Sequence, residues 1–408
     1  MSEVSSPSLS SLSLEEQVAR LMRGTALVAP QNGLREKLIK SQKTGKPLII
    51  KLGLDPTAPD IHLGFAVVLR KLRQFQDLGH TVVIIIGDYT ALIGDPSGRS
   101  ATRPMLSEEE IKRNGETYVD QLAQILDRDK TVVRFNGEWL GKLSFADLVR
   151  LTSKMTVAQV LTREDFAKRM DAQQPISLHE LLYPLAQAYD SVAIFADVEM
   201  GGMDQTFNIL AGRDLQGELG QDQQIGMFMP LLVGLDGQKK MSKSLKNYVG
   251  IAEDALTQYS KVMSLGDAQM REYFLLCTDV PEAEFDHLLA SVTNPMDAKH
   301  RLASEIVTIY HGAQAADTAG AEWRRIHSAG QFPADAPEIV VPENPIGIVP
   351  LVLACKFAPS KSEAKRLVEQ GGVSLNGAKI DNPAEAVTIE NGAQFKVGKK
   401  NYAVLKTS

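Results

Sequence analysis

The stretch between residues 52 and 64, LGLDPTAPDIHLG, has the composition of an anion-binding turn. It leaves an apolar run and enters a helical pattern through two glycines, two prolines and small polar residues, so backbone N–H groups can face a phosphate. His62 closes the turn, and a buried turn histidine bonded to a carbonyl is the alternative explanation for it. The turn follows the first strand of an α/β unit, at the edge where ligands bind, and this position favours a functional role.

A second stretch, KKMSKSLKN from Lys239 to Asn247, places four lysines and two serines in a short loop after an apolar strand. Flexible ammonium groups on such a loop stabilise the charge that develops on a departing pyrophosphate. A solvated basic turn is the alternative explanation. The two stretches together are much more specific than either alone, and together they predict a nucleotide site.

A third group, Tyr183, Gln187 and Asp190, is spaced at i, i+4 and i+7, which is one face of a helix. The surrounding sequence, ELLYPLAQAYDSVAIF, is mostly apolar, so these side chains are expected to point into a pocket. A polar, solvated helix face is the alternative. In a pocket, the three groups would supply acceptors for an ammonium group and a hydroxyl.

The elements that position these residues are predicted from hydrophobic periodicity. Apolar, β-branched runs alternate with amphipathic helical stretches such as 65–79, and this alternation predicts an α/β domain over 36–250 with a parallel sheet covered by helices. A mainly helical insertion is expected at about 105–190, with a capping-box start at Ser107. The runs expected as strands include 47–53, 81–88 and 229–237.

The rest of the chain divides by composition. Residues 1–35 are expected to form a flexible or helical extension, without the basic and apolar segments of a secretory signal. Helical periodicity and much alanine predict an α-helical domain at 251–330, and proline and glycine predict a linker at 331–345. Residues 346–408 carry nine Lys or Arg against five acids, which predicts a small basic module.

Composition limits the class of protein. With 408 residues, 44% hydrophobic and 23% charged, the chain is long enough for two or three cored domains, and its apolar runs are too short to span a membrane. The net charge of -6 requires any nucleic-acid contact to come from local patches. Cys277 and Cys355 suit neither a disulfide framework nor a metal site, which favours a reducing cytoplasm, and no metal ligands are predicted.

His62-Leu63-Gly64-Phe65 and the later KMSKS segment together resemble the two signatures of class I aminoacyl-tRNA synthetases. The resemblance implies a Rossmann-like catalytic domain that uses ATP as a substrate, with Mg²⁺ bound to the nucleotide and not to the protein. The catalytic residues that it implies are Thr57, His62, Lys240 and Lys243. The ATP contacts that it implies are Asp55, His62, Gly64, Phe65, Gly202, Asp204 and Lys243.

The helix with Tyr183 is similar to that of the tyrosyl-tRNA synthetases, whose equivalent Tyr and Gln hold the amino group of tyrosine while the Asp receives the phenol. The implied tyrosine ligands are Asp95, Tyr183, Gln187, Asp190 and Gln205. The segment SKSEAKRLVEQGGVSLNGAKI reads as a helix, a Gly-Gly turn and a hairpin, and resembles an S4-type RNA-binding domain. Its Lys361, Lys365 and Arg366 would contact phosphates, while an ordinary solvated basic helix is the alternative.

The resemblance implies a cytoplasmic ligase of protein biosynthesis that activates L-tyrosine with ATP and transfers it to tRNA(Tyr). The region 251–330 would read the anticodon. A homodimer is implied by the resemblance alone, with an interface in the inserted helical stretch, and no membrane contact is expected. The alternatives are a tryptophan-specific relative, which would lack the basic tail, and a catalytically inactive RNA-binding relative.

Two positions depart from the family pattern. Lys51 stands where one branch has a tyrosine that contacts the substrate hydroxyl, and Phe65 replaces the last histidine of the first signature. Phe65 also heads an apolar helix face with Val68, Leu69 and Leu72, so a core role is one explanation. Packing of its ring against adenine or ribose is the other.

Overall fold

The computed structural model describes residues 12–55, 61–95, 121–292, 294–327, 332, 336–398 and 401–407. The chain forms two compact units, Met1–Ala316 and Asp317–Ser408, and each is described by itself. Thr57 and the predicted helix start at Ser107 lie outside the described residues.

The first unit is built on a six-stranded sheet with the order β1-β6-β5-β2-β3-β4. All neighbours pair in parallel except β1, which is antiparallel to β6. This confirms the predicted α/β class. The strands are β1 (Leu27–Ala29), β2 (Ile49–Leu54), β3 (Thr81–Ile86), β4 (Thr131–Phe135), β5 (Val198–Gly202) and β6 (Ile225–Met229).

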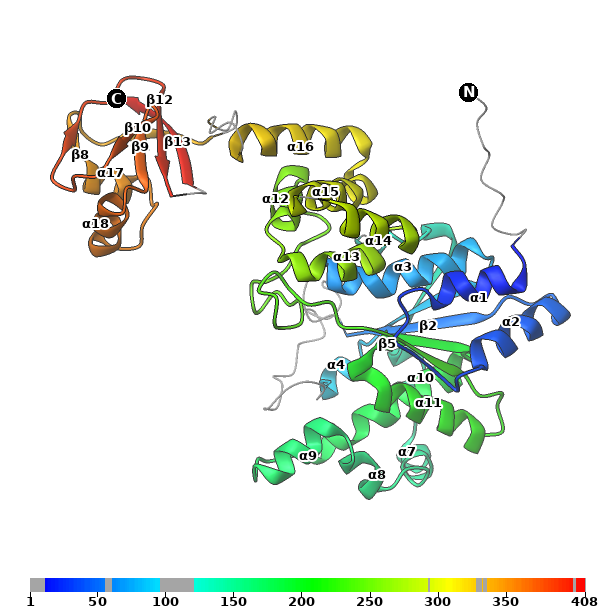
Figure 1. Cartoon of the computed structure of the whole chain (residues 1–408). Coiled ribbons are helices and arrows are strands. Elements are labelled where there is room, and N and C mark those ends of the chain that lie inside the picture. The colour runs from blue at the N-terminus through cyan, green and yellow to red at the C-terminus, as the bar shows by residue number, and fades with distance from the viewer. Residues whose placement is uncertain are drawn as a thin grey trace, which may run out of the picture. The chain divides into compact units, whose positions relative to one another are not determined.

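Helices cover both faces of this sheet (Figure 1). One face carries α3 (Leu63–Asp77), whose residues Leu69, Leu72 and Phe75 are fully buried. The other face carries α10 (Tyr183–Ile194) and α11 (Thr206–Glu218), which pack against each other. Burial on both faces explains why β3 and β6 are apolar almost throughout.

The chain changes direction across the sheet at β2. It runs from β2 through α3 to β3 and β4 on one side, and later returns through α10 to β5 on the other side. The strand order therefore reverses between β2 and β5, and the carboxyl ends of these two strands define a switch point, where open α/β sheets bind ligands.

The structure corrects two expectations about the middle of this unit. The strand expected at 229–237 is β6, which ends at Met229, because Pro230 follows it and proline cannot donate to a strand ladder. The insertion expected to be mainly helical also contributes β4 to the sheet. Its described helices are α6 (Gly137–Leu140), α7 (Phe145–Thr152), α8 (Val157–Leu161) and α9 (Glu164–Asp171).

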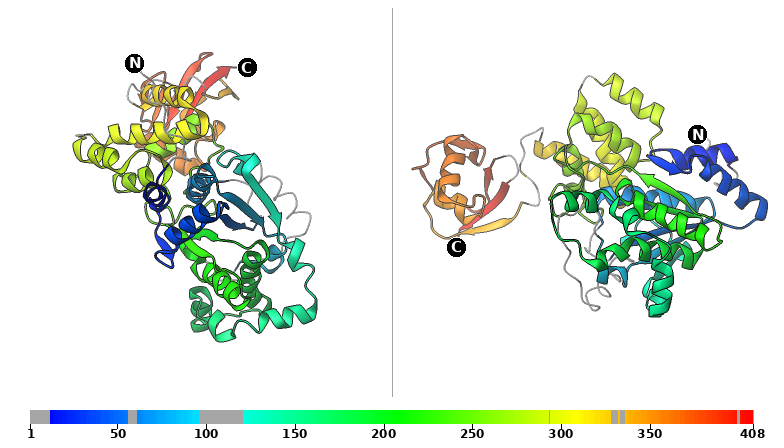
Figure 2. Two further views of the ribbon diagram at one scale, coloured as in Figure 1. Left: turned by 90° about the vertical axis from the view of Figure 1, so that its right-hand side faces the viewer. Right: turned by 90° about the horizontal axis from the view of Figure 1, so that it is seen from below.

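The N-terminal extension also contributes a strand that the sequence did not predict. After α1 (Leu14–Met22), the short β1 pairs with β6 and α2 (Gly33–Thr44) follows. Figure 2 shows α1 and α2 side by side in dark blue. The described part of the segment therefore packs against the α/β core, and a capping box between Ser13 and Glu16 begins α1.

The stretch expected to be helical after residue 250 is helical. It consists of α12 (Ala255–Met263), α13 (Met270–Cys277), α14 (Glu282–Ser291), α15 (Pro295–His311) and α16 (Ala313–His327). Contacts of α13 with α3 join this bundle to the α/β core. Within the residues searched, no helix combines the length and the apolar character needed to cross a membrane.

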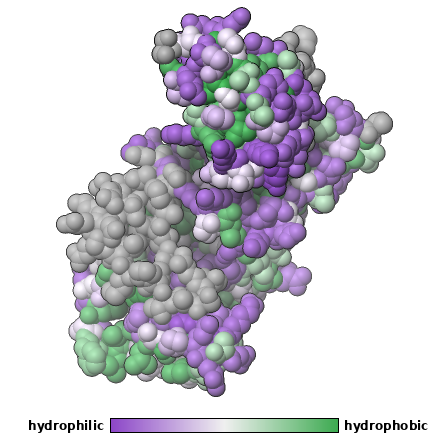
Figure 3. Space-filling model, turned by 90° about the vertical axis from the view of Figure 1, so that its left-hand side faces the viewer, coloured by the Kyte–Doolittle hydropathy of each residue, from purple (hydrophilic) through white to green (hydrophobic). Residues whose placement is uncertain are grey.

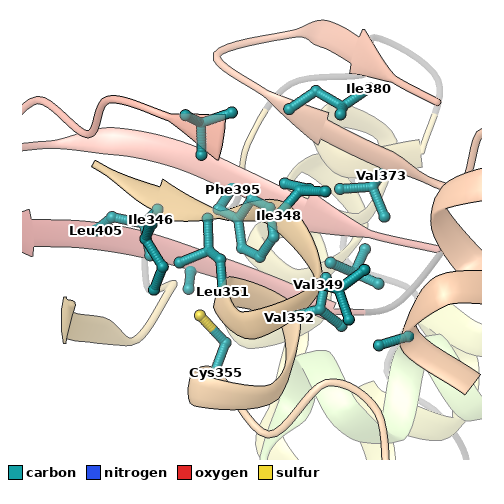
Figure 4. Packing of buried hydrophobic residues seen from close by; sticks show 14 of the residues in the cluster. Ile346, Ile348, Val349, Leu351, Val352, Cys355, Val373, Ile380, Phe395 and Leu405 are labelled. Atoms are coloured by element: carbon teal, nitrogen blue, oxygen red, sulfur yellow. The ribbon is translucent and has the colours of Figure 1, made fainter. Parts of the chain in front are cut away.

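The second unit has a five-stranded sheet, β10-β9-β12-β13-β7, and its own apolar core, which includes Phe395, Leu351 and Val352 (Figure 4). Helix, glycine turn and hairpin follow one another as predicted, in α18 (Lys361–Glu369), β9 (Val373–Leu375) and β10 (Ala378–Ile380). The other elements are β7 (Glu338–Val341), β8 (Ile346–Gly347), α17 (Ile348–Ala354), β11 (Ala386–Val387), β12 (Ala393–Val397) and β13 (Asn401–Thr407). Because β7 pairs with β13, part of the expected linker 331–345 belongs to this sheet.

Candidate active site

A cleft of about 650 Å³ opens at the carboxyl ends of β2 and β5, at the switch point of the first unit. It brings together every described residue that the sequence predicted for the nucleotide and amino-acid sites. These are Asp55, His62, Gly64, Phe65, Asp95, Tyr183, Gln187, Asp190, Gly202, Asp204, Gln205, Lys240 and Lys243. The predicted site is thus one continuous cavity.

His62 is the N-cap residue of α3, with extended backbone geometry. Its Nδ1 accepts a hydrogen bond from the backbone N–H of Phe65 at 3.3 Å, which places the ring proton on Nε2. Burial, together with the charge of Lys243, lowers the pKa of His62 to about 4. At neutral pH the ring is therefore an uncharged donor at the helix N-terminus, where N–H groups favour anions.

The Asn247 side chain bridges the loop 239–247 internally and to the preceding turn. Asn247 accepts from the backbone N–H of Ser242 at 2.8 Å and donates to Asp236 at 2.8 Å. The loop touches the His62 turn, since the N–H of Gly64 donates to the Met241 sulfur at 3.3 Å. The two sequence signatures are therefore in direct contact.

Lysine side chains of this loop remain accessible to a ligand. Lys240 forms an ion pair with Asp204 at 3.2 Å, and about half of its side chain is exposed. An exposed pair of this kind is weak and easily exchanged for contacts to a phosphate. An added Cβ at Gly202 would lie 2.7 Å from an Asp204 oxygen, so a larger residue there would displace the Asp204 side chain.

Asp55, at the end of β2, joins the two halves of the cleft. Its carboxylate accepts from Thr90 and from the hydroxyl of Tyr183, both at 2.9 Å. Burial, and secondarily the charge of Asp55, raises the pKa of Tyr183 well above its usual value. Tyr183 is thus a neutral hydroxyl that donates to Asp55 and can accept a hydrogen bond from a ligand.

Asp190 is the buried acceptor at the closed end of the cleft. It is 3% exposed, and it accepts from the Trp139 indole N–H at 2.8 Å and from Asn136 at 3.3 Å. Burial raises the pKa of Asp190 to about 6, while the nearby charge of Lys51 opposes the shift. The sequence reasoning missed Asn136 and Trp139, although NGEW directly follows the apolar run that forms β4.

Three side-chain amides form a cluster beside the amino-acid residues. Asn208 donates to the Oε1 atoms of both Gln187 and Gln205 at 3.0 Å, and it accepts from Arg163 at 2.7 Å. Gln205 donates in turn to Asp95 at 3.1 Å. Asn208 and Arg163 were also missed, and the available signal was that Asn208 lies three residues after Gln205.

Phe65 occupies the border of the cleft. Its side chain is partly buried and lines the cavity, whereas Leu69 and Leu72 of the same helix are fully buried. Phe65 therefore lines the cleft and is not part of the fully buried core.

Other candidate groups lie outside the cleft. Within the described part of the chain, no group of three or more His, Cys, Asp or Glu could hold a metal ion.

In the second unit, α18 carries Lys361, Lys365 and Arg366. Lys365 lies 3.7 Å from Glu369 and Arg366 lies 2.5 Å from Glu363, and both basic side chains remain more than half exposed.

A histidine turn and a lysine loop that meet at the switch point of a parallel sheet place this chain among the class I aminoacyl-tRNA synthetases. The family described as tRNA synthetases class I (W and Y) matches residues 42–328. The family described as Tyrosine–tRNA ligase SYY-like C-terminal domain matches residues 329–405.

Curated relatives show which of these two kinds of synthetase, W or Y, the chain resembles. The tyrosine–tRNA ligase of Moorella thermoacetica is 50% identical over 402 residues, which cover 97% of each chain. That of Carboxydothermus hydrogenoformans is 51% identical over 95% of this chain and 97% of the relative. The chain belongs to the tyrosine–tRNA ligase family.

Solved structures support the fold. The tyrosyl-tRNA synthetase of Archaeoglobus fulgidus, complexed with L-tyrosine, is 20% identical with a TM-score of 0.58, covering 76% of this chain and all of that one. A C-terminally truncated mitochondrial tyrosyl-tRNA synthetase from Aspergillus nidulans is 21% identical with a TM-score of 0.61. It covers 79% of this chain and 95% of that chain.

We predict that His62 stays neutral, with its proton on Nε2, from about pH 8 down to about pH 5.5, because its pKa is near 4. The measurement is NMR of ¹⁵N-histidine-labelled protein, with the His62 signals assigned by their loss in His62→Gln. A titration of these signals with a midpoint between about pH 6 and pH 7, the range of an unperturbed histidine, would contradict the prediction.

Proposed function

We propose that this protein is a tyrosine–tRNA ligase, which activates L-tyrosine with MgATP and transfers the tyrosyl group to tRNA(Tyr). The observation that carries the proposal is the composition of one cleft. At its closed end is the buried carboxylate of Asp190, and at its open end are the phosphate-directed groups His62, Lys240 and Lys243.

Asp190 would accept the phenol O–H of tyrosine. Phenylalanine lacks this donor, so its binding would leave the substrate-facing lone pair of a buried carboxylate without a partner, at a cost of about 1–3 kcal/mol or more. Rejection of phenylalanine through a hydroxyl-binding site is already known for this enzyme family. Asn136 and Trp139 keep the other lone pairs of Asp190 occupied and fix the direction of the carboxylate.

The amino group of tyrosine would be held by acceptors at the middle of the cleft. Asp95, the hydroxyl oxygen of Tyr183 and Oε1 of Gln187 supply them, and Gln205 faces the carboxylate side. The Tyr183 hydroxyl suits this role because its O–H already donates a hydrogen bond to Asp55, so toward the cleft its oxygen can act as an acceptor. An ammonium group bonded to three acceptors places the carboxylate toward the nucleotide end.

Adenylate formation needs no nucleophile from the protein. An oxygen of the tyrosine carboxylate attacks the α-phosphorus of ATP, the bond to the bridging oxygen of the β-phosphate breaks, and pyrophosphate leaves. Nε2–H of His62 donates to a phosphate oxygen from one side, while Lys240 and Lys243 stabilise the charge from the other. Mg²⁺ bound to the nucleotide helps to neutralise the leaving group.

The nucleoside and the tRNA would occupy the remaining groups. Asp204 accepts from the ribose hydroxyls, close to Gly202, and the ring of Phe65 packs against the nucleoside. A terminal ribose hydroxyl of the tRNA then attacks the tyrosyl carbonyl carbon, and AMP leaves. The helical region 251–330 would contact the anticodon, and the basic residues of α18 would contact tRNA phosphates.

A homodimer completes the proposed assembly. Large apolar side chains are exposed along the insertion, with Phe145 81% and Leu178 83% exposed. Val149 on α7, Val157 on α8 and Met170 on α9 are exposed as well, and we call these five side chains the insertion patch. Green side chains gather at the lower edge of Figure 3, the height at which these helices lie in Figure 1. Contiguous exposed apolar surface of this kind marks an interaction site.

We also propose a cytoplasmic location, because the two cysteines, Cys277 and Cys355, are free and buried. Fractionation of cells would test the compartment, and recovery of the protein outside the cytoplasm would contradict it.

We predict tyrosine-dependent exchange of pyrophosphate into ATP, with none supported by phenylalanine or tryptophan. His62→Ala lowers the rate by about 100-fold, because the transition state loses one hydrogen-bond donor to the charge that develops on the phosphates. His287→Ala, an exposed histidine on α14, keeps the wild-type rate. Absence of exchange with every amino acid would instead indicate an inactive RNA-binding relative. Exchange with tryptophan would contradict the assignment of tyrosine as the substrate.

We predict that Phe145→Asp/Leu178→Asp converts a dimer into a monomer in sedimentation-velocity experiments, because two charges would be buried in the apolar interface. Leu219→Asp, an exposed leucine outside this patch, serves as the control and leaves the dimer intact. A double variant that still sediments as a dimer would place the interface elsewhere.

A further inference from the structure

A buried ion pair lies behind the amino-acid end of the cleft. Lys51 on β2 and Glu199 on β5 are adjacent across the parallel pairing of these strands, and Nζ lies 3.0 Å from Oε1. The two residues are 0% and 1% exposed. Lys51 is one of the two positions at which the sequence departs from the family pattern, so the known role of that position does not explain the pair.

Hydrogen bonds satisfy both charges. The ammonium group of Lys51 donates to the backbone carbonyl of Gln187 at 2.9 Å, to Ser191 at 2.8 Å and to Glu199. The carboxylate of Glu199 accepts in addition from Gln187 Nε2 at 3.1 Å, Ser191 at 2.9 Å and Gln224 at 2.6 Å. Gln187 thus bonds to both residues of the pair: its backbone carbonyl accepts from Lys51, and its side-chain Nε2 donates to Glu199.

The pair determines which end of the Gln187 amide faces the cleft. An ionised carboxylate can only accept, so only Nε2 of Gln187 can face Glu199. Oε1 of Gln187 must then point away, toward Asn208 and the cleft, as it does. A flipped amide would present N–H donors to a substrate ammonium group and repel it.

We propose that Lys51 and Glu199 are positioning residues that fix the Gln187 amide so that its oxygen accepts from the ammonium group of tyrosine. The proposal rests on the proposed function, and it names a specific dependence of tyrosine binding on two residues that do not touch the substrate. A role confined to holding β2 against β5 is the competing explanation.

The double variant Lys51→Met/Glu199→Gln separates these explanations. It removes both charges together, so neither is left unpaired in the interior. Ser191 and Gln224 still donate to one end of residue 199, so a glutamine there directs its oxygen to them and its amide nitrogen to Gln187. Gln187 then flips to accept from that nitrogen, and its own N–H groups enter the cleft.

The test compares ligands that differ at the amino group. Tyramine keeps the ammonium and the phenol, while 3-(4-hydroxyphenyl)propionate keeps the phenol and the carboxylate but has no amino group. In the double variant we expect KM for tyrosine and Ki for tyramine to rise at least about tenfold, the scale of one lost hydrogen bond to a charged group. Ki for the propionate and KM for ATP stay within about twofold, a change well below the effect of one such bond.

A control for strand support lies two residues before Glu199, where a lysine of α2 pairs with Asp197. Lys37 pairs with Asp197 at 3.1 Å, and Asp197 accepts from the backbone N–H of Ile49, where β2 begins. Lys37→Met/Asp197→Asn therefore removes a partly buried pair that supports the start of β2 but does not bond to the Gln187 amide, and all four constants should keep their wild-type values. Thermal unfolding of each variant verifies that the fold is retained.

Two outcomes would overturn the proposal. One is unchanged tyrosine and tyramine constants in a folded double variant, and the other is an equal loss for tyramine and the propionate. If the double variant does not fold, Asn208→Asp tests the same amide from its other end, because it replaces the donor that faces Oε1 of Gln187. Glu199 still accepts only from Nε2 in this variant, so the amide keeps its direction, and the absence of a loss selective for the ammonium ligands supports the proposal. A loss selective for these ligands would show that Asn208 sets the amide, and it overturns the proposal. Lack of tyrosine-dependent exchange in the wild type would refute the proposed function instead.

Discussion

Burial of two carboxylates, Asp190 on α10 and Glu199 on β5, is the constraint on which the rest of the site depends. Asp190 and Glu199 are almost completely removed from water, and a buried carboxylate persists only when donors surround it. The donors come from several elements: Trp139 and Asn136 follow β4, Lys51 lies on β2, and Gln224 precedes β6. The strand order of the sheet is what brings them together, so the fold and the recognition of the substrate cannot be separated.

The two ends of the cleft are built differently. The amino-acid end is a closed network in which Gln187 is bonded on both sides of its amide. The nucleotide end carries a loop with the half-exposed Lys240, whose partner Asp204 is also accessible. A fixed pocket suits discrimination by a buried acceptor, while an accessible lysine loop suits a phosphate whose charge develops only during the reaction.

The sequence predicted those parts of the site that depend on local patterns. The two signature loops and the helix with Tyr183 are contiguous, so motif and periodicity located them, and the bundle after residue 250 followed from helical periodicity. The strand expected at 229–237 was displaced because apolar residues continue past Pro230 into a loop. Trp139, Asn136 and the partner of Lys51 depend on strand pairing between distant segments, and no local pattern identifies such contacts.

The central claim is that the ionised carboxylate of Asp190 recognises the phenol of tyrosine. The most direct test is calorimetric binding of tyrosine, without ATP, as a function of pH. The pKa of Asp190 is raised to about 6, so the carboxylate is ionised above that value and protonated below it. The association constant should be level above about pH 7 and fall toward a tenfold loss per pH unit below the midpoint. Binding that stays constant down to about pH 5, as for an unperturbed Asp, would contradict the account.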